Sequence, residues 1–534
     1  MRKRIGVLLF IVFLLCLCIG LGLFFWARNK FQNFEPMARQ RIINAIDDRF
    51  DADADLKSLQ IRLYPHPQVV GEGLSIRHKN WVNPQPLIYI AQFTAETDYD
   101  TVMNKRNHVD LVRLKGLTIH ISRHGAASLI KTGEEQGHEV DSATPGQDRT
   151  QFKFLIEKII ADGATLQIDP KVEGKEPLRY DIQQMTLRNI GPGQPMAFQA
   201  MLTNAKPPGI IASQGSFGPW QKDDPRSTAV SGNYNFQNAD LGVFKGISGT
   251  LSSVGQYHGV LQAIIVDGTT DTPQFALKRG GEPVHLTTRF HSVVNGTDGD
   301  TILDPVDAHF DHSEFICRGG VRDEGKEHGK TVHLYAVTPH ARMEDILHLI
   351  MGRGRPFLAG TVDFRSKILI PPGGRDVLDK LHLDGRFKIA KAEFASPQVE
   401  AKLLTLSDRA RGINKKEQEE HEGPQTVASD FDGRFVLDNG MTYFSVLQFS
   451  VPDAAIRLAG SYNLRTSEMN MDGEFRMTAT LSQTQSGVKR WMLMPFNKLF
   501  ERNGSGFEVP ITLRGTKDHP EIGTEVFHHR FTIH

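Results

Sequence analysis

Leu383-Asp384-Gly385-Arg386-Phe387-Lys388-Ile389 is the stretch from which the fold class follows most directly. Its order is apolar-Asp-Gly-x-Phe-x-apolar, and the same order recurs at 431–437 and 471–477. Asp-Gly pairs are typical of tight turns between neighbouring strands. The uneven spacing of the three copies predicts a loosely recurring strand-and-turn unit and not a strict solenoid.

Apolar and polar residues alternate over many other short segments. The apolar positions of these segments include Leu59, Ile61 and Leu63; Leu117, Ile119 and Ile121; Val284, Leu286 and Phe290; Val332, Leu334 and Ala336; Val362, Phe364, Ile368 and Ile370; Ile456, Leu458 and Tyr462; Phe475 and Met477; and Val509, Ile511 and Leu513. A period of two is typical of strands with one buried face. Such strands form antiparallel sheets, whereas parallel sheets have continuous apolar runs. The fold class is therefore predicted as mainly β, antiparallel, with few short helices.

Other local signals refine this prediction. Asp162-Gly163, between the apolar segments 156–160 and 164–168, predicts a hairpin. Helices are expected from Glu35-Pro36 onward, over 343–351 and over 488–500. Polar composition predicts solvated loops at 125–150 and 411–428.

The amino-terminal residues predict a membrane anchor. Arg2-Lys3-Arg4 precedes an uncharged stretch, 5–27, which Arg28 and Lys30 close. About 20 apolar residues suffice to cross a bilayer core, so this stretch is long enough to span it. The basic cluster favours a cytoplasmic amino terminus. We therefore expect a single-pass inner-membrane protein with the bulk of the chain in the periplasm.

Composition excludes several classes of function. The 534 residues contain 62 Lys plus Arg and 62 Asp plus Glu, and such a neutral chain has no electrostatic reason to bind nucleic acid. Of the three cysteines, Cys16 and Cys18 lie in the apolar stretch, which leaves Cys317 without a partner for a disulfide. The chain contains no phosphate-binding loop, nucleophile elbow or zinc-protease motif. We therefore assign no catalytic residue and no cofactor, and expect a protein that is not an enzyme.

No metal site is assigned either. Asp51-Ala52-Asp53-Ala54-Asp55 resembles the start of a calcium loop, but Leu56 and Arg62 stand where such a loop needs Gly and Glu. A polar helix exit is the better interpretation of this segment. The 21 histidines are scattered without the spacing of metal ligands, so surface or strand positions explain them.

Several segments, taken in order, resemble the AsmA family of envelope proteins, which is related to bridge-like lipid-transfer proteins. The apolar stretch and short helix are followed by the segments 49–61, 65–67 and 71–76 (Gly71-Glu72-Gly73-Leu74-Ser75-Ile76). The middle carries 249–257, 266–268 and 271–275, and the last third carries 392–394, 406–412 and 507–516. A body shorter than the longest relatives and the polar insert 411–428 depart from the family pattern.

The resemblance implies an elongated, bent sheet that forms a groove with an apolar interior and binds or transfers phospholipid. It also implies a part in outer-membrane biogenesis, with partner proteins unknown. The residues alone leave a closed β-sandwich equally open, and the resemblance favours the groove. On that reading the lipid-groove candidates are Val284, Phe290, Phe364, Ile368, Phe475, Met477, Ile511 and Leu513. The alternatives are an assembly factor for outer-membrane proteins, acting by strand addition, and a non-catalytic envelope scaffold.

The predicted organisation has seven parts. They are a cytoplasmic end (1–4), a transmembrane helix (5–27), an AsmA-like helix and strands (28–124), a polar loop (125–150), a central β-groove (151–410), a charged loop (411–428) and an AsmA-like carboxyl-terminal β segment (429–534).

Overall fold

The computed structural model describes most of the chain after the amino-terminal stretch. The described residues are 34–50, 52–78, 85–104, 108–121, 155–169, 177–191, 193–221, 224–278, 282–324, 329–350, 356, 358–395, 429–478, 507–516, 519–526 and 529–533. The predicted anchor 5–27, the loops 125–150 and 411–428 and the predicted helix 488–500 lie outside them. No helix within the described ranges combines the length and the apolar composition needed to cross a bilayer.

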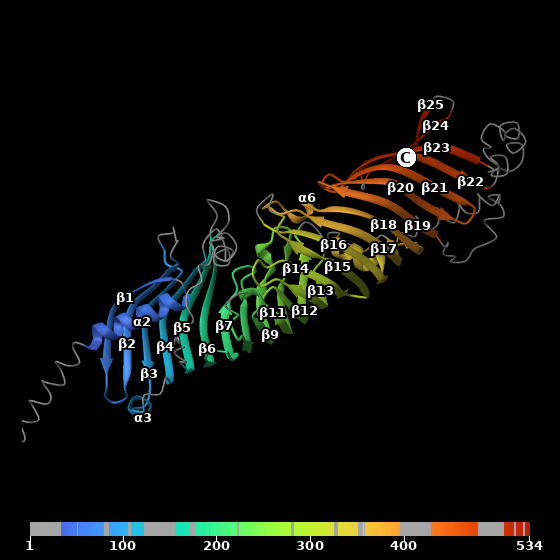
Figure 1. The fold of residues 1–534 in the computed structure, drawn as a ribbon. Coiled ribbons are helices and arrows are strands. Elements are labelled where there is room, and N and C mark those ends of the chain that lie inside the picture. Colours follow the sequence, from blue (N-terminus) through green and yellow to red (C-terminus); the bar gives the residue numbers. More distant parts are fainter. Residues whose placement is uncertain are drawn as a thin grey trace, which may run out of the picture. The chain divides into compact units, whose positions relative to one another are not determined.

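The chain divides into two units, each an open sheet (Figure 1). Unit 1 comprises Met1–Lys206 and Ile210–Tyr234, and unit 2 comprises Pro207–Gly209 and Asn235–His534. The strands of unit 1 are β1 (Ala52–Arg62), β2 (Gln68–His78), β3 (Ile88–Glu96), β4 (His108–Ile121), β5 (Leu155–Ile168), β6 (Leu178–Ile190), β7 (Met196–Thr203) and β8 (Ile210–Phe217). β9 (Ala229–Asp240) contributes to both units.

Unit 2 contains most of the strands. They are β10 (Ile247–Ser248), β11 (Thr250–Val260), β12 (Ala263–Leu277), β13 (Val284–Val294), β14 (Thr301–Phe310), β15 (Ser313–Arg322), β16 (Thr331–His340), β17 (Leu358–Ile370), β18 (His382–Phe394), β19 (Ser429–Asp438), β20 (Met441–Val451), β21 (Ala454–Asn463), β22 (Glu468–Met477), β23 (Phe507–Thr516), β24 (Pro520–Val526) and β25 (His529–Ile533). The described helices are short: α2 (Phe34–Phe50) and α3 (Tyr99–Met103) in unit 1, and α5 (Met343–Ile350) and α6 (Val377–Lys380) in unit 2, besides the 3-10 turns η2 (Pro225–Ser227) and η3 (Leu241–Val243).

Helix α2 covers one face of unit 1. Its Ile42, Ile43 and Ile46, at helical spacing, pack on a buried cluster that includes Leu56 and Ala161. Its polar side chains bond the backbone of β1, since Arg39 Nε donates to the Leu56 carbonyl (2.5 Å) and Glu35 accepts from the Ile61 amide (3.2 Å). These bonds satisfy backbone groups that an edge strand would otherwise expose.

The predicted hairpin at Asp162-Gly163 is wrong, because both residues lie inside the continuous strand β5. Gly163 has a positive φ of 69°, and the pairing with β4 and β6 skips it. The register to both neighbours is the same before and after Gly163, so no residue is inserted. Ala161 and Ala164, three positions apart, nevertheless both lie in the core, so the alternation of faces shifts at this point. Gly73 and Gly116 have similar φ values (65° and 62°), and their Cβ positions would lie 2.9 Å from the Cβ atoms of Lys57 and Ala91. The irregular positions of neighbouring strands are thus aligned, and their positive φ favours glycine at each of them.

Unit 1 also departs from the purely antiparallel sheet that the alternation predicts. β4 and β5 are parallel, with His108 opposite Leu155 and Ile121 opposite Ile168. Alternation reports that one face is buried, but it carries no information about the direction of the neighbouring strand. The other strand pairs of unit 1 from β1 to β8 are antiparallel.

In unit 2 every pairing from β11 to β25 is antiparallel. The recurring Asp-Gly-x-Phe units are not turns, because they lie inside β18, β19 and β22. Gly433 lies opposite Phe387, and Gly385 lies opposite Phe435. A Cβ at Gly433 would approach the Phe387 ring to 2.8 Å. Glycine in one strand therefore makes room for phenylalanine in the next.

Helix α5 packs against one part of the unit 2 sheet. Leu347 joins a buried cluster with Val362 and Ile389. The buried Asp345 carboxylate accepts from the His312 amide (2.9 Å) and the Ser313 hydroxyl (2.7 Å). These bonds fix the start of the helix against the β14–β15 turn.

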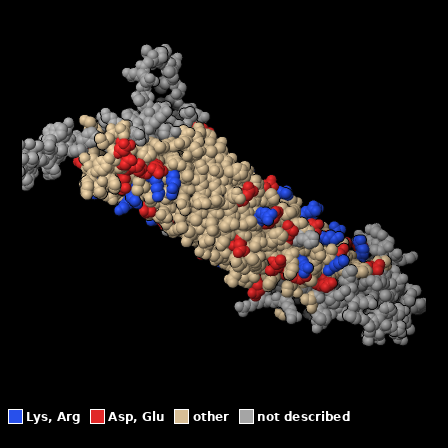
Figure 2. Space-filling view, turned by 90° about the horizontal axis from the view of Figure 1, so that it is seen from below, with Lys and Arg blue, Asp and Glu red and all other residues tan. Residues whose placement is uncertain are grey.

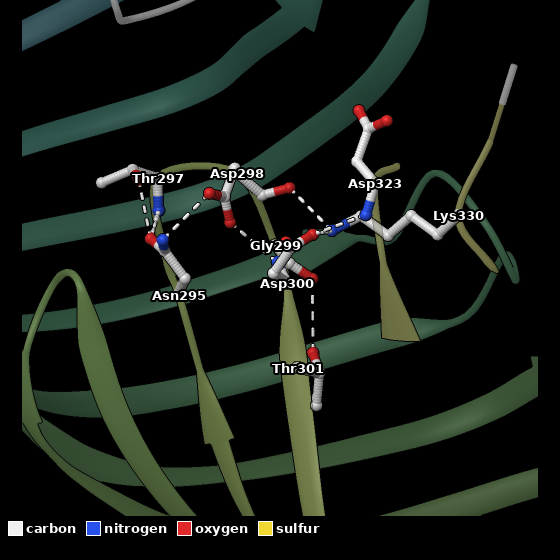
Figure 3. Close-up of polar contacts among 8 residues, drawn as sticks. All are labelled: Asn295, Thr297, Asp298, Gly299, Asp300, Thr301, Asp323 and Lys330. Atoms are coloured by element: carbon white, nitrogen blue, oxygen red, sulfur yellow. Dashed lines mark hydrogen bonds and ion pairs between the residues drawn. The ribbon is translucent and has the colours of Figure 1, made fainter. Parts of the chain in front are cut away.

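A polar network closes the turn between β13 and β14 (Figure 3). Lys330 Nζ donates to the Asp300 carboxylate and to the Asp298 carbonyl, both at 2.8 Å. The Asp323 amide donates to the same Asp300 carboxylate (3.0 Å). The network ties this turn to β15 and β16.

We expect Leu56→Ala to destabilise unit 1, because Leu56 is 0% exposed beneath α2. Loss of a fully buried leucine costs about 2–5 kcal/mol. Hydrogen exchange of the β1–β3 amides should show the loss of protection. Leu178→Ala, the same change at a side chain that is 44% exposed, is the matched control and should leave protection unchanged. Equal effects would contradict the placement of Leu56 in the core.

We also expect the β13–β14 turn to contribute stability that depends on pH. Partial burial alone would raise the pKa of Asp300, but the bonds from Lys330 and Asp323 and the Lys330 charge together lower it from its ordinary value of 3.8. A carboxyl whose folded pKa is lowered stabilises the fold above 3.8 and loses this contribution as the pH falls through the folded pKa. Asp300→Asn should therefore lower the urea midpoint at neutral pH and have less effect in acid.

Lys330→Met tests the cause of this shift. It keeps the Asp300 carboxyl but removes the hydrogen bond and the charge that lower its pKa. Its midpoint should also fall at neutral pH more than in acid. A loss that does not change with pH would contradict the role of Asp300 ionisation.

Candidate functional site

An uninterrupted ladder of uncharged residues crosses unit 2 from β11 to β24. Each residue lies directly opposite the next in the neighbouring strand: Gly255, Gly268, Phe290, Val306, Cys317, Ala336, Ser366, Gly385, Phe435, Phe444, Gly460, Met471, Leu513 and Ile522. Residues joined in this way point to the same side of a sheet. We call this side the uncharged face of unit 2.

A second ladder on the same side repeats the pattern. It consists of Phe364, Phe387, Gly433, Leu447, Leu458, Gly473, Ile511 and Thr524. Next to the second ladder, on its far side from the first, lies a rung of the opposite side: Asp363, Lys388, Asp432, Gln448, Arg457 and Glu474. Charges of both signs thus occupy one side of the sheet and are absent from both ladders of the other.

Phenylalanine rings form a continuous layer on the uncharged face. Ring centroids lie 6.2 Å apart for Phe364 and Phe435, 5.5 Å for Phe387 and Phe431, and 6.4 Å for Phe435 and Phe444. These separations are in the range of favourable aromatic contacts. All of these side chains are only half-buried.

Cover for this layer is partial. Helix α5 packs near Phe364, Phe387 and Phe431, but Phe435 and Phe444 lie outside that cluster. Figure 1 shows the described strands of unit 2 side by side in one layer, with no second sheet over them. The closed sandwich that the residues alone left open is therefore not the architecture of the described part of unit 2.

The eight candidates from the sequence all lie on the uncharged face. Phe290, Phe364, Ile368, Phe475, Ile511 and Leu513 are half-buried, whereas Val284 and Met477 are buried. The first six can therefore contact a ligand directly. Val284 and Met477 support the layer from within.

Sequence reasoning missed Cys317 as a member of this face. It lies opposite Val306 and Ala336, both uncharged. Burial raises the pKa of the Cys317 thiol. Along β15, Cys317 and the charged Arg318 point to opposite sides of the sheet. This alternation is the sequence signal that could have assigned Cys317 to the uncharged face.

Unit 1 has a cleft of a different character. It has a volume of about 590 Å³ and is lined mainly by amide and hydroxyl side chains, with Arg188 the one charged residue: Thr186, Arg188, Ala197, Phe198, Gln199, Gln214, Gly215, Ser216, Ser231, Gly232 and Asn233. β7 and β8 contain no Lys, Arg, Asp or Glu. Figure 2 shows a wide area without these residues on one face of the molecule.

One group of side chains has the composition of a metal site. His108, Asp110 and Glu157 offer ligand atoms that all lie within 4.8 Å of one another. They come from the parallel pair β4–β5, which sequence spacing could not reveal. His108 Nε2 already lies 2.9 Å from Asp110 Oδ1, and all three side chains reach the surface, so we assign them no metal.

The predicted polar helix exit at 51–55 is wrong in part. Ala52–Asp55 belong to β1, and Asp53 and Asp55 are exposed there. Arg39 lies 3.4 Å from Asp55, which gives this carboxylate an ordinary surface ion pair.

The comparison with protein families gives one match, over the amino-terminal part of the chain. No curated protein and no solved structure matches it. The family model described as "AsmA family" matches residues 1–252, which include the segments 49–61 and 71–76 and all of unit 1. This match supports an AsmA-family assignment.

Proposed function

We propose that the uncharged face of unit 2 binds phospholipid acyl chains. In this proposal, segment 5–27 anchors the protein in the inner membrane, and the periplasmic body binds or transfers lipid in support of outer-membrane biogenesis. The AsmA-family match over residues 1–252 supports an envelope-related function. The uncharged ladder from Gly255 to Ile522 carries the lipid part of the proposal.

Physical chemistry favours an acyl chain over other occupants of this face. Half-exposed phenylalanines in water lose the free energy that burial would supply. Each methylene moved from water onto an apolar surface gains about 0.8 kcal/mol, so a chain lying along the layer is strongly retained. A charged ligand would find no charged partner on either ladder. We propose in addition that the sheet of unit 2 bends, so that its uncharged face forms a groove.

Binding and transfer of this kind need no chemical step. We propose accordingly that the protein is not an enzyme.

A second candidate is an assembly factor for outer-membrane proteins. In the described part of unit 2, the last strand, β25, pairs with β24 alone. Its other edge can accept a strand from another chain. Outer-membrane proteins recovered with the purified chain, in place of lipid, would favour this function, and recovery of neither would leave an envelope scaffold.

Phe364→Asp and Phe444→Asp should lower the phospholipid that copurifies with the protein, measured by mass spectrometry. Both rings are half-buried, so the new carboxylate can reach water and the thermal transition should shift only modestly, less at Phe444 than at Phe364, which packs against the cluster beneath α5. Tyr443→Asp is the matched control. It introduces the same charge at an aromatic residue that neighbours Phe444 on the other side of β20 and is 53% exposed.

Two outcomes would oppose the proposal. Equal lipid in all three variants would mean that the face does not bind it. A collapsed thermal transition for Phe364→Asp and Phe444→Asp would mean that a further layer covers the rings.

Bound lipid should also protect the Cys317 thiol. Two proteins in a Cys16→Ser, Cys18→Ser background form the comparison: one retains Cys317, and the other carries Cys317→Ser with Arg318→Cys. Arg318 points to the charged side and is 57% exposed. We expect a charged thiol reagent to react at least about tenfold more slowly with Cys317, because burial raises its pKa.

Removal of lipid distinguishes protection of Cys317 by bound lipid from the effect of burial on its pKa. Removal of lipid should accelerate the reaction of Cys317 and leave that of Arg318→Cys unchanged. The same rate at Cys317 before and after lipid removal would place the lipid elsewhere.

A further inference from the structure

The amino-terminal side of unit 1 enters the fold at a defined place. Glu35, in the first turn of α2, accepts a hydrogen bond from the Ile61 amide at 3.2 Å. Ile61 is the next-to-last residue of β1, so the chain reaches unit 1 beside the β1–β2 turn, 63–67. Seven residue steps separate the end of the predicted anchor, at 27, from Phe34, which spans about 25 Å at full extension. The β1–β2 turn is therefore held near the membrane by the anchor itself.

Large apolar side chains are exposed at this end. Tyr64 is 87% exposed and Met103 82%, while Leu63, Tyr99 and Met37 are 42%, 48% and 53% exposed. Exposed residues of this size, when they gather in one place, mark a contact surface. We call these five residues the apolar tip of unit 1.

Hydrogen bonds join helix α3 to the β1–β2 turn. The Tyr99 hydroxyl, in α3, donates to the Leu63 carbonyl and to the Pro65 carbonyl (3.3 Å). The Thr97 amide donates to the Pro67 carbonyl (3.0 Å). These bonds fix α3 against the β1–β2 turn, and Figure 1 shows the helix at that end of the strands.

We propose that the apolar tip rests in the interface of the membrane that holds the anchor. Tyrosine suits this position because its ring is apolar and its hydroxyl remains hydrated. Methionine and leucine add apolar contact without a charge that would have to be desolvated. The Asp98 carboxylate, on the same segment, accepts from the Thr101 amide (2.6 Å) at the start of α3. Arg62 and His66, both exposed on either side of the tip, can face lipid phosphates.

This inference rests on the predicted anchor of the proposed function and not on lipid bound to unit 2. It adds a second attachment, which orients unit 1 on the bilayer.

The test uses the full chain in phosphatidylcholine–phosphatidylglycerol nanodiscs, with Cys16, Cys18 and Cys317 replaced by serine. Single variants Tyr64→Cys, Met103→Cys and Leu178→Cys carry a fluorophore, and a headgroup nitroxide lipid is the quencher. Leu178 is 44% exposed, and the pairing through β2 to β6 places it at the opposite end of the strands. We expect several-fold stronger quenching at positions 64 and 103 than at 178.

A charge change then tests the contact itself. With the fluorophore on Met103→Cys, Tyr64→Glu should reduce quenching to the level at position 178. Tyr89→Glu is the matched control, since Tyr89 is 41% exposed at the opposite end of the same strands, and it should leave quenching unchanged.

Weak quenching at all three positions, or quenching at 178 alone, would overturn the inference. So would shielding of position 64 from aqueous iodide in native membranes without quenching in nanodiscs, because a partner protein would then cover the tip. Failure of the chain to enter nanodiscs would remove the anchor and the inference together. Phospholipid on unit 2 is measured in the same samples, and its absence with strong quenching at 64 would sink only the proposed lipid function.

Discussion

Hydrogen bonding between neighbouring strands is the interaction on which both units depend. In an ordinary domain, two layers bury their apolar faces against each other, and that burial stabilises the fold. Within the described residues, unit 1 has α2 for this purpose, and unit 2 has little beyond α5. Each strand of unit 2 from β12 to β24 instead relies on partners on both sides. The backbone ladder therefore carries stability that a core supplies elsewhere.

The side chains of unit 2 follow from this dependence. Where phenylalanine lies opposite glycine, as Phe387 does opposite Gly433, the ring covers the glycine backbone and is itself partly buried by it. The two strands therefore remain close together. On the other side, Asp363, Lys388 and Asp432 alternate in sign across three strands and keep that side hydrated. Two faces with opposite chemistry are thus built within single strands, and neither requires a second layer.

Much of this architecture could be predicted from the sequence. A period of two places Phe364 and Ile368 on one side and Arg365 and Lys367 on the other, and pairing between strands only extends that division. The helix beginning near Glu35 and the one at Met343 were also evident, because apolar residues recur there at helical spacing.

The errors have one physical source: local signals carry no information about neighbouring strands. Asp-Gly favours a positive φ equally well in a turn and inside a strand, and only the pairing of β5 on both sides shows that Asp162-Gly163 lies inside a strand. The parallel direction of β5 and the approach of Glu157 to His108 depend on the return of the chain after β4. Contacts of this kind are set by the order and direction of the strands in the sheet, and not by the spacing of residues along the sequence.

The surface relief of unit 2 favours a flexible occupant. Along one ladder, Gly385 is followed by Phe435 and Phe444 and then by Gly460, so bulky rings alternate with bare backbone over a few strands. A rigid partner, such as a helix, would need a matching series of knobs and holes to gain contact over such a surface. An acyl chain adjusts its own torsions and can cover rings and glycines alike at little conformational cost per contact. Among apolar occupants, the relief therefore selects for chains that stay fluid, which agrees with the half-exposed rather than buried state of the phenylalanines.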